Sequence, residues 1–313
     1  MAPGFQHIPV MVTEMLAALR PNPAGRYADG TLGGAGHAAA ILAATSPSGW
    51  LCGCDRDGAA IEAARQRLAE FAGRFEIRQG SYAELADWVE PDSCDGVLLD
   101  LGVSSPQLDE AERGFSFQQD GPLDMRMDRR QPLTAADLVN TADPEELARM
   151  LWELGGERDA RRFARAITRE REQRPFGTTR QLADLIEKLA PRRGRRTHPA
   201  TRVFQALRMA VNDEIGSLRK GLAGALKILR PGGRLAVITF QGVDDRIVKD
   251  FGRARARDYT FTGGMDVPEL RKPRVPELKW VQRKPITPSP AEVVANPRCR
   301  SAQLRLMEKL GDK

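Results

Sequence analysis

The sequence of 313 residues contains a glycine-rich turn and two aspartates whose spacing suits the binding of a ligand. The run from Arg26 to His37, RYADGTLGGAGH, has four glycines within seven residues. We expect a short strand before the turn and an alanine-rich helix after it, so backbone N–H groups can approach an electron-rich ligand closely. A second expected strand ends at Asp55, 19 residues after Gly36. At that spacing a carboxylate accepts hydrogen bonds from a ribose.

The second aspartate, Asp100, ends another apolar strand, which we expect from Asp95 onward. The loop that follows, LGVSSPQ, runs to Gln107 and adds two hydroxyl groups, Ser104 and Ser105. Open α/β sheets bind ligands at the carboxyl ends of their strands, so this loop is a candidate site. Tyr82 follows a further expected strand and either stacks on a flat ring or packs as an ordinary aromatic.

Two nucleoside cofactors fit such a turn, nicotinamide dinucleotide and S-adenosylmethionine. The run from Gly34 to Ala39 even matches the dinucleotide pattern G-x-G-x-x-A. A dehydrogenase needs a hydride-relay residue near an acid, and none of the three histidines has that context. The late turn and strand from Pro231 to Phe240 are similar to those of methyltransferases, which favours the methyl donor.

The composition is that of a soluble protein, which we expect to be cytoplasmic. Charged residues make up 29% and hydrophobic residues 41% of the chain. No apolar run approaches the roughly 20 residues of a membrane span. The four cysteines lack zinc-site spacing, so we expect reduced thiols and no metal.

The net charge of +6 is unevenly distributed. Residues 1–148 hold 11 basic and 23 acidic side chains, residues 149–202 hold 15 and 7, and residues 246–313 hold 16 and 8. Two basic segments beside an acidic first half suggest a polyanion partner, although a solvated arginine-rich surface is an equal alternative.

The hydrophobic periodicity predicts an α/β protein with a helical insertion. Strands and helices alternate up to Asp100, with Thr13 as the expected N-cap of the first helix. Helical patterns then fill 134–189, one long helix is expected over 200–229, and a late strand resumes the sheet. We therefore predict three segments, a first sheet part over 1–107, an insertion over 108–200 and a second sheet part over 201–313.

Six motifs between Asp29 and Ser301 strengthen this interpretation, and the resemblance that they carry spans about residues 7 to 310. They are DGTLGGAGH from Asp29, LLDLGVSSPQLD from Leu98, RGFSF from Arg113, DGPLDMRMD from Asp120, HPATR from His198 and NPRCRS from Asn296. In type and order they resemble the signatures of the bacterial small-subunit ribosomal RNA (cytosine-N4)-methyltransferases, the MraW/RsmH family.

This resemblance implies a Rossmann-type S-adenosylmethionine-dependent methyltransferase sheet with an inserted all-helical domain. It implies methyl transfer to the exocyclic amine of a cytidine in the decoding region of 16S ribosomal RNA, on the RNA or on the small ribosomal subunit. The resemblance is compatible with a homodimer and with a monomer. The cofactor contacts that it implies, together with Gly34 of the turn, are Ala35, Gly36, His37, Asp55, Tyr82, Asp100 and Gln107.

One departure from the family pattern concerns the late strand. Where the family usually has Ser-Phe-His-Ser, this chain has Thr239-Phe-Gln-Gly242. A glutamine can donate and accept hydrogen bonds but cannot titrate. An alternative function is therefore a non-catalytic or altered-specificity RNA-binding assembly factor that keeps the cofactor pocket. A methyltransferase acting on another RNA, DNA or a protein is a second alternative.

The chemistry suggests roles for individual groups. The cytosine amine is a poor nucleophile because its lone pair is delocalised into the ring, so oxygen acceptors at the amine protons would localise it. We expect Asp100 and Ser104 to line the junction of methyl donor and amine, with Asp100 acting only on the cofactor as the alternative. The loop with Phe115 and Phe117 either stacks on an extruded base or packs in the core.

Overall fold

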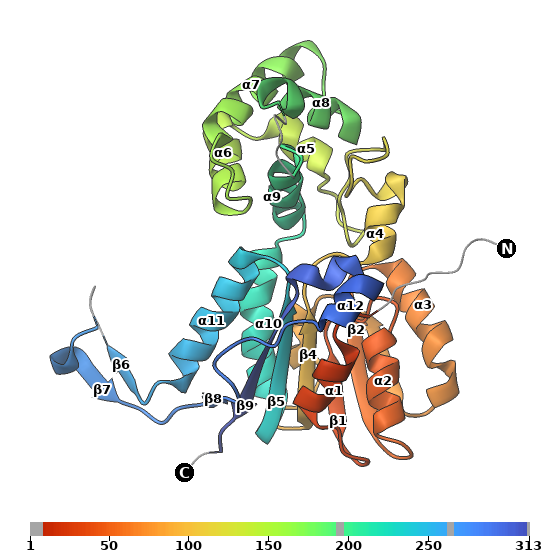
Figure 1. Cartoon of the computed structure of the whole chain (residues 1–313), viewed down its shortest axis with the longest axis vertical. Helices are drawn as coiled ribbons and strands as arrows, with labels where there is room; N and C mark the ends of the chain where they lie inside the picture. Colours follow the sequence, from red (N-terminus) through yellow and green to blue (C-terminus); the bar gives the residue numbers. More distant parts are fainter. Residues whose placement is uncertain (1–8, 192–196, 262–265, 312–313) are drawn as a thin grey trace. The chain divides into compact units, whose positions relative to one another are not determined.

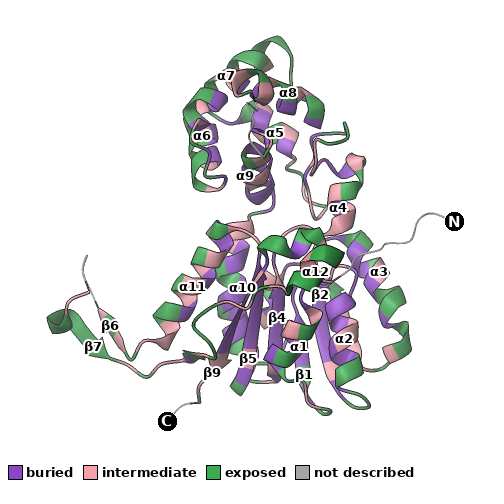
Figure 2. Ribbon diagram, in the orientation of Figure 1, coloured by how far each residue is buried: buried purple, intermediate pink, exposed green. Residues whose placement is uncertain are grey.

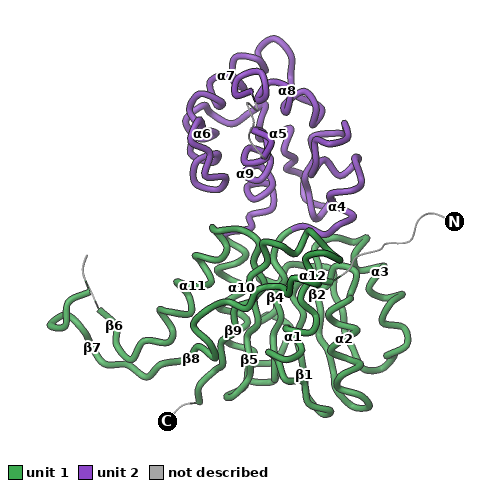
Figure 3. Tube along the Cα trace, viewed as in Figure 1, with its two compact units in different colours: residues 1–102, 216–313 green, residues 103–215 purple. Residues whose placement is uncertain are grey.

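The computed structural model describes residues 9–191, 197–261 and 266–311, which form two compact units (Figure 3). Unit 1 combines Met1–Gly102 with Gly216–Lys313, and unit 2 is Val103–Ile215. The insertion predicted over 108–200 lies within unit 2.

Unit 1 is built on a seven-stranded sheet with the order β3-β2-β1-β4-β5-β9-β8 (Figure 1). The strands are β1 (Arg26–Asp29), β2 (Trp50–Asp55), β3 (Phe75–Gln79), β4 (Cys94–Asp100), β5 (Leu229–Thr239), β8 (Leu278–Trp280) and β9 (Gln303–Lys309). Strands β1 to β5 pair in parallel, whereas β9 runs antiparallel to both β5 and β8. The predicted α/β class is confirmed, and the sheet is Rossmann-like.

Both faces of the sheet are covered, which explains why β4 and β5 are continuous apolar runs. The strands β4 and β5 are buried over most of their length (Figure 2). Leu98 of β4 belongs to one core, and its neighbours Val97 and Leu99 belong to the other. The first core packs against α1 (Val12–Leu19), α2 (Gly36–Ala44) and α3 (Gly58–Leu68), and the second against α10 (Glu214–Ile228) and α11 (Gly242–Ala256). The four cysteines are free and buried.

Unit 2 is helical and has its own apolar core. Its helices are α4 (Ser105–Asp109), α5 (Ala135–Thr141), α6 (Pro144–Glu153), α7 (Ala160–Gln173), α8 (Thr179–Leu189) and α9 (Thr201–Val211), with the 3₁₀ turn η3 (Ala111–Arg113). Thr134 and Thr178 form capping boxes that begin α5 and α8. These starts follow the predicted pattern.

The single helix predicted over 200–229 is wrong, because the chain breaks between α9 and α10. Asp213 has a φ of 43°, a left-handed conformation that no continuous helix contains. Asn212, which ends α9, is 2% exposed and bonds to groups outside the helix. The break therefore reflects a tertiary contact of Asn212, which periodicity does not record.

One smaller expectation also differs from the structure, because Thr13 lies inside α1, whose N-cap is Met11 with a φ of 56°.

The remaining elements of unit 1 are short. They include η4 (Pro268–Leu270), β7 (Arg271–Pro273), which pairs with β6 (Tyr259–Phe261), and β8. Helix α12 (Pro290–Ala295) and η5 (Pro297–Ser301) follow, and η1 (Ala69–Phe71) and η2 (Tyr82–Asp87) complete unit 1. No helix among the described residues is long and apolar enough to cross a membrane.

Candidate active site

Three carboxyl groups end three neighbouring strands of unit 1. Asp29 ends β1, Asp55 ends β2 and Asp100 ends β4. Because β1 lies between β2 and β4 and all three run in parallel, the carboxyl ends share one edge of the sheet. Sequence reasoning singled out Asp55 and Asp100 but missed Asp29, although its position directly before the glycine turn was a usable signal.

The glycine turn is anchored on Asp55. The backbone N–H of Gly33 donates to Oδ2 of Asp55 at 2.8 Å, and the N–H of Asp57 donates to Oδ1 at 2.9 Å. Ala35, with a φ of 57°, leads into α2, which begins at Gly36. A Cβ atom at Gly36 would lie 2.6 Å from Cγ of Pro9, so the close packing there requires glycine. The turn thus brings Gly34, Ala35 and Gly36 to the end of β1.

Burial shapes the electrostatics of the three carboxyl groups. Burial raises the pKa of Asp29 to about 7. The hydrogen bond from the backbone N–H of Thr31 lowers this pKa, and the negative charge of Asp55 raises it further. Burial also raises the pKa of Asp55 to about 6, although the N–H groups of Asp57 and Gly33 oppose the rise. Burial, followed by the charge of Asp29, raises the pKa of Asp100 to about 8. Such a cluster favours a cationic ligand, which would stabilise the charged forms.

His37 links the glycine turn to Asp100. Its Nε2 lies 2.7 Å from the carbonyl oxygen of Val10, and because a carbonyl only accepts, Nε2 carries the proton. Its Nδ1 lies 3.8 Å from Oδ2 of Asp100. His37 is 4% exposed, so its ring has a fixed orientation beside the carboxyl group.

Thr31 connects Asp29 with Asp100 through its side chain. Its Oγ1 accepts from the backbone N–H of Asp100 at 2.6 Å, and its own N–H donates to Oδ1 of Asp29 at 3.0 Å. Among the described residues, Oδ2 of Asp29 and Oδ1 of Asp100 are buried side-chain atoms without a hydrogen-bond partner. Buried acceptors of this kind are costly unless a ligand satisfies them.

Tyr82 follows β3 and is held between glycines. A Cβ atom at Gly30 would lie 2.6 Å from Cβ of Tyr82, and one at Gly221 of α10 would clash with the Tyr82 ring. The ring is half-buried and packs against the core on the α10 side. Packing of the Tyr82 ring against the core is therefore observed, and stacking of its exposed part on a flat ring stays a prediction.

Ser104 and Gln107 belong to unit 2 and share a helix start. Ser104 is the N-cap of α4, and its backbone N–H donates to Oε1 of Gln107 at 3.1 Å in a capping box. Gln107 is 5% exposed. In the same capping box the Ser104 side chain accepts from the backbone N–H of Gln107, a structural role that the sequence did not reveal.

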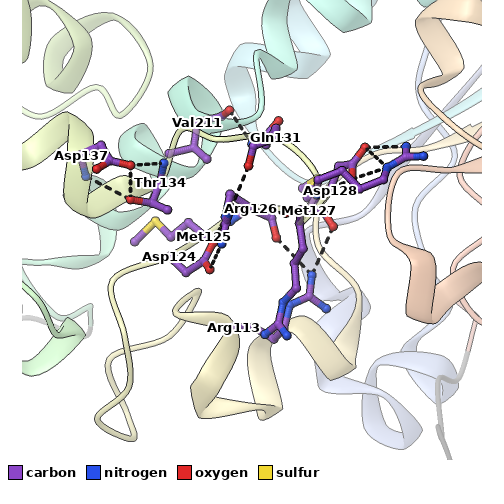
Figure 4. A network of polar contacts seen from close by, with 12 residues as sticks. Arg113, Asp124, Met125, Arg126, Met127, Asp128, Gln131, Thr134, Asp137 and Val211 are labelled. Atoms are coloured by element: carbon purple, nitrogen blue, oxygen red, sulfur yellow. Dashed lines mark hydrogen bonds and ion pairs between the residues drawn. The ribbon is translucent and has the colours of Figure 1, made fainter.

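The polar loop that follows α4 is an ordered network rather than a loose connection (Figure 4). Arg126 donates to both carboxylate oxygens of Asp124, at 2.8 and 2.9 Å, and to the carbonyl of Gln131 at 2.8 Å. Arg113 donates to the carbonyls of Arg126 and Met127 at 3.1 and 3.3 Å.

The aromatic residues of this loop are packed within unit 2. Phe115 is 7% exposed, and the Phe117 ring centroid lies 4.6 Å from that of His198 and 4.8 Å from that of Phe204. The alternative of core packing is therefore the observed one for Phe115.

The donor set fits S-adenosylmethionine. That cofactor carries a sulfonium and an ammonium cation, which match the clustered carboxyl groups and their two open oxygens, and a ribose, which matches Asp55. Among the described residues, no group of three His, Cys, Asp or Glu side chains could hold a metal ion.

The family model and the sequence relatives that match this chain agree on one family. The model of the MraW methylase family matches residues 4–310. A protein of Symbiobacterium thermophilum named Ribosomal RNA small subunit methyltransferase H is 51% identical over 98% of each chain. A protein of Geobacter sulfurreducens with the same name is 52% identical over 98% of this chain and 99% of its own. An rRNA methylase structure from Streptococcus thermophilus covers 98% of this chain at 12% identity, with a TM-score of 0.42.

Proposed function

Because the chain belongs to the MraW methylase family, we propose that it transfers a methyl group from S-adenosylmethionine to N4 of a cytidine in 16S ribosomal RNA. The observation that carries this proposal is the cluster of Asp29, Asp55 and Asp100 around the glycine turn. Family membership favours an enzyme over the alternative of a non-catalytic assembly factor. We also propose a cytoplasmic location and ribosomal RNA, free or in the small subunit, as the substrate.

The residues of the chain divide the work between binding and reaction. Asp55 binds the ribose hydroxyls, and the turn at Gly34, Ala35 and Gly36 offers backbone N–H groups to the cofactor. His37, Tyr82 and Gln107 complete the cofactor contacts. When bound, the cofactor supplies a methyl group activated by a sulfonium.

Asp100 has the reactive role in this proposal. Its unpartnered Oδ1 accepts a hydrogen bond from the cytosine amine, which localises the nitrogen lone pair toward the methyl group. The cationic cofactor favours the ionised form of Asp100, and the amine releases one proton after it has gained the methyl group. Asp100 can take up this proton because burial favours its protonated form. Ser104 supplies a second acceptor for the amine.

The test is methyl transfer from labelled cofactor to unmethylated small subunits and to naked ribosomal RNA, with nucleoside analysis of the product. N4-methylcytidine supports the proposal and shows which substrate form is used. Cofactor binding without transfer to either substrate would favour the assembly-factor alternative.

Two substitutions separate the roles of Asp100 and Ser104. For Asp100→Asn we expect turnover at saturating cofactor to fall at least about 100-fold. An unchanged turnover with weaker cofactor binding would reduce Asp100 to a cofactor ligand. For Ser104→Ala, a loss of stability without loss of turnover would leave Ser104 with only its capping role.

A further inference from the structure

Helix α7 of unit 2 contains two kinds of arginine. Arg162 donates to the carbonyl of Leu189 at 2.7 Å, and Arg171 donates to the carbonyls of Val139 and Ala142 at 2.9 and 2.8 Å. These two side chains tie α7 to its neighbours. Among residues 9–191, 197–261 and 266–311, no such anchoring bond joins the exposed side chains of Arg161, Arg165 and Arg169 to a neighbouring helix.

The three exposed arginines form a stripe along the helix. Each is four residues from the next, which spaces them about 6 Å apart along the axis on nearly the same face. The opposite face, with Phe163, Ala164 and Ile167, is buried in the core of unit 2. The stripe is therefore fixed in direction by the packing of its own helix.

The positive charges of the three arginines repel one another, and no acidic side chain among the described residues pairs with them. In the part of the chain that the structure describes, none of the three arginines has an ion pair, and Glu172, which follows on the same face, forms none with Arg169. Elsewhere in unit 2, arginines pair with acids, as Arg126 does with Asp124 and Arg208 with Glu214. Like charges at a spacing of four residues destabilise a helix, so the repeated positive charge points to an external polyanion.

An exposed aromatic side chain lies at the same end of the α6–α7 hairpin as the start of the stripe. Trp152, near the end of α6, is 59% exposed, and α6 packs along α7. Only a short connection separates α6 from α7, and it is bonded back to α6 through the N–H of Gly156 and the carbonyl of Trp152 at 3.0 Å. Indole rings stack on nucleic-acid bases with little sequence preference.

From these observations we infer that the α7 stripe (Arg161, Arg165 and Arg169), with Trp152, is a surface that binds ribosomal RNA outside the methylated nucleotide. The arginines contact successive phosphates, and Trp152 stacks on an unpaired base. This inference rests on the proposed function for the identity of the nucleic acid, but the surface itself rests on charge, spacing and exposure.

The test compares two triple variants with equal loss of charge. The first is Arg161→Gln, Arg165→Gln and Arg169→Gln, and the control is Arg26→Gln, Arg65→Gln and Arg219→Gln on exposed positions of unit 1. Binding of a fluorescent RNA with the decoding-region sequence is measured by anisotropy at several salt concentrations. We expect the stripe variant to bind about 10-fold more weakly than the control, with a slope of log affinity against log salt lower by about 2.

Two further variants guard against a folding artefact. Replacing the same three arginines by lysine keeps the charge and should keep the salt slope. Trp152→Ala should weaken binding at least about 5-fold and leave the slope unchanged, because stacking releases no counterions. Cofactor affinity, measured by calorimetry, should be the same in all variants.

The outcomes for this surface and for the proposed function are distinguishable. If the stripe variant and the control bind RNA equally well while the wild type methylates RNA, the α7 stripe is not an RNA-binding surface. The proposed methyltransferase function is then unaffected. A wild type that binds RNA through the stripe but transfers no methyl group supports the surface and contradicts the function.

Discussion

The buried carboxyl group of Asp100 gives a prediction in which stability and pH are linked. The pKa of Asp100 rises from 3.8 to about 8 because the group is buried beside Asp29. At 1.36 kcal/mol for each unit, ionising this carboxyl in the folded protein costs up to about 6 kcal/mol. Relaxation of the site and entry of water lower the measured cost, so we expect about 3 kcal/mol.

The sign follows from the two protonation states. The unfolded chain releases this proton near pH 4, whereas the folded protein keeps it until about pH 8, so folding stability falls as the pH rises between these values. Asp100→Asn removes the charge and keeps the shape. We therefore expect the variant and the wild type to have similar unfolding free energies at pH 4, and the variant to be more stable by about 3 kcal/mol at pH 9.

The assay is urea unfolding without cofactor from pH 4 to pH 9, with hydrogen exchange of the β1 and β4 amides to follow unit 1 alone. Asp250→Asn on the exposed side of α11 is the matched control, because it makes the same replacement of a carboxyl group outside the buried cluster. A difference between Asp100→Asn and wild type that is constant with pH, or a less stable variant at pH 9, would refute the reasoning.

Three further predictions concern the cofactor site and unit 2. Since the pKa values of Asp29, Asp55 and Asp100 are raised to about 7, 6 and 8, binding of the cationic cofactor should release protons and tighten from pH 6 to pH 8.5. Calorimetry in buffers with different ionisation enthalpies measures this release, and a pH-independent affinity would contradict it. Gly221→Ala should displace the Tyr82 ring and weaken cofactor binding at least about 5-fold, whereas Gly224→Ala on the same helix, 3.4 Å from Cβ of Ala86, should preserve binding and stabilise the protein by up to about 1 kcal/mol. Asn212→Ala should lower the unfolding free energy of unit 2 by about 2–3 kcal/mol, because the buried side chain bonds to Met125, Met127 and Arg208, while Gln131→Ala, which removes one bond to Val211, should cost about 1 kcal/mol or less.

The sheet edge of the site could be predicted from the sequence because its signals are local. Asp55 and Asp100 each end an apolar run, and such a run in a covered parallel sheet needs no partner information to be identified. The glycine turn can also be identified locally, because the backbone constraints there require glycine. At Gly36, for example, Pro9 leaves no room for a side chain.

The features that the sequence did not reveal depend on distant contacts. Asn212 interrupts a long helical pattern because it bonds to Met125 and Met127, more than 80 residues away. Thr31 has an ordinary position after Asp29, and its bond to the backbone of Asp100 depends on the pairing of β1 with β4. Periodicity and capping rules describe neither kind of contact.

These distant contacts join the elements that the proposed chemistry needs. Thr31 fixes the backbone of Asp100 relative to Asp29, so the two buried carboxyl groups cannot move apart to reduce their repulsion. The sheet holds them in place through the pairing of β1 and β4, and the raised pKa values are the consequence. Burying two acidic groups close together without a cationic partner lowers the folding stability of unit 1. Binding of a cation would offset this loss of stability. The stability of unit 1 and its affinity for a cationic cofactor should therefore change in opposite directions when Asp100 is neutralised.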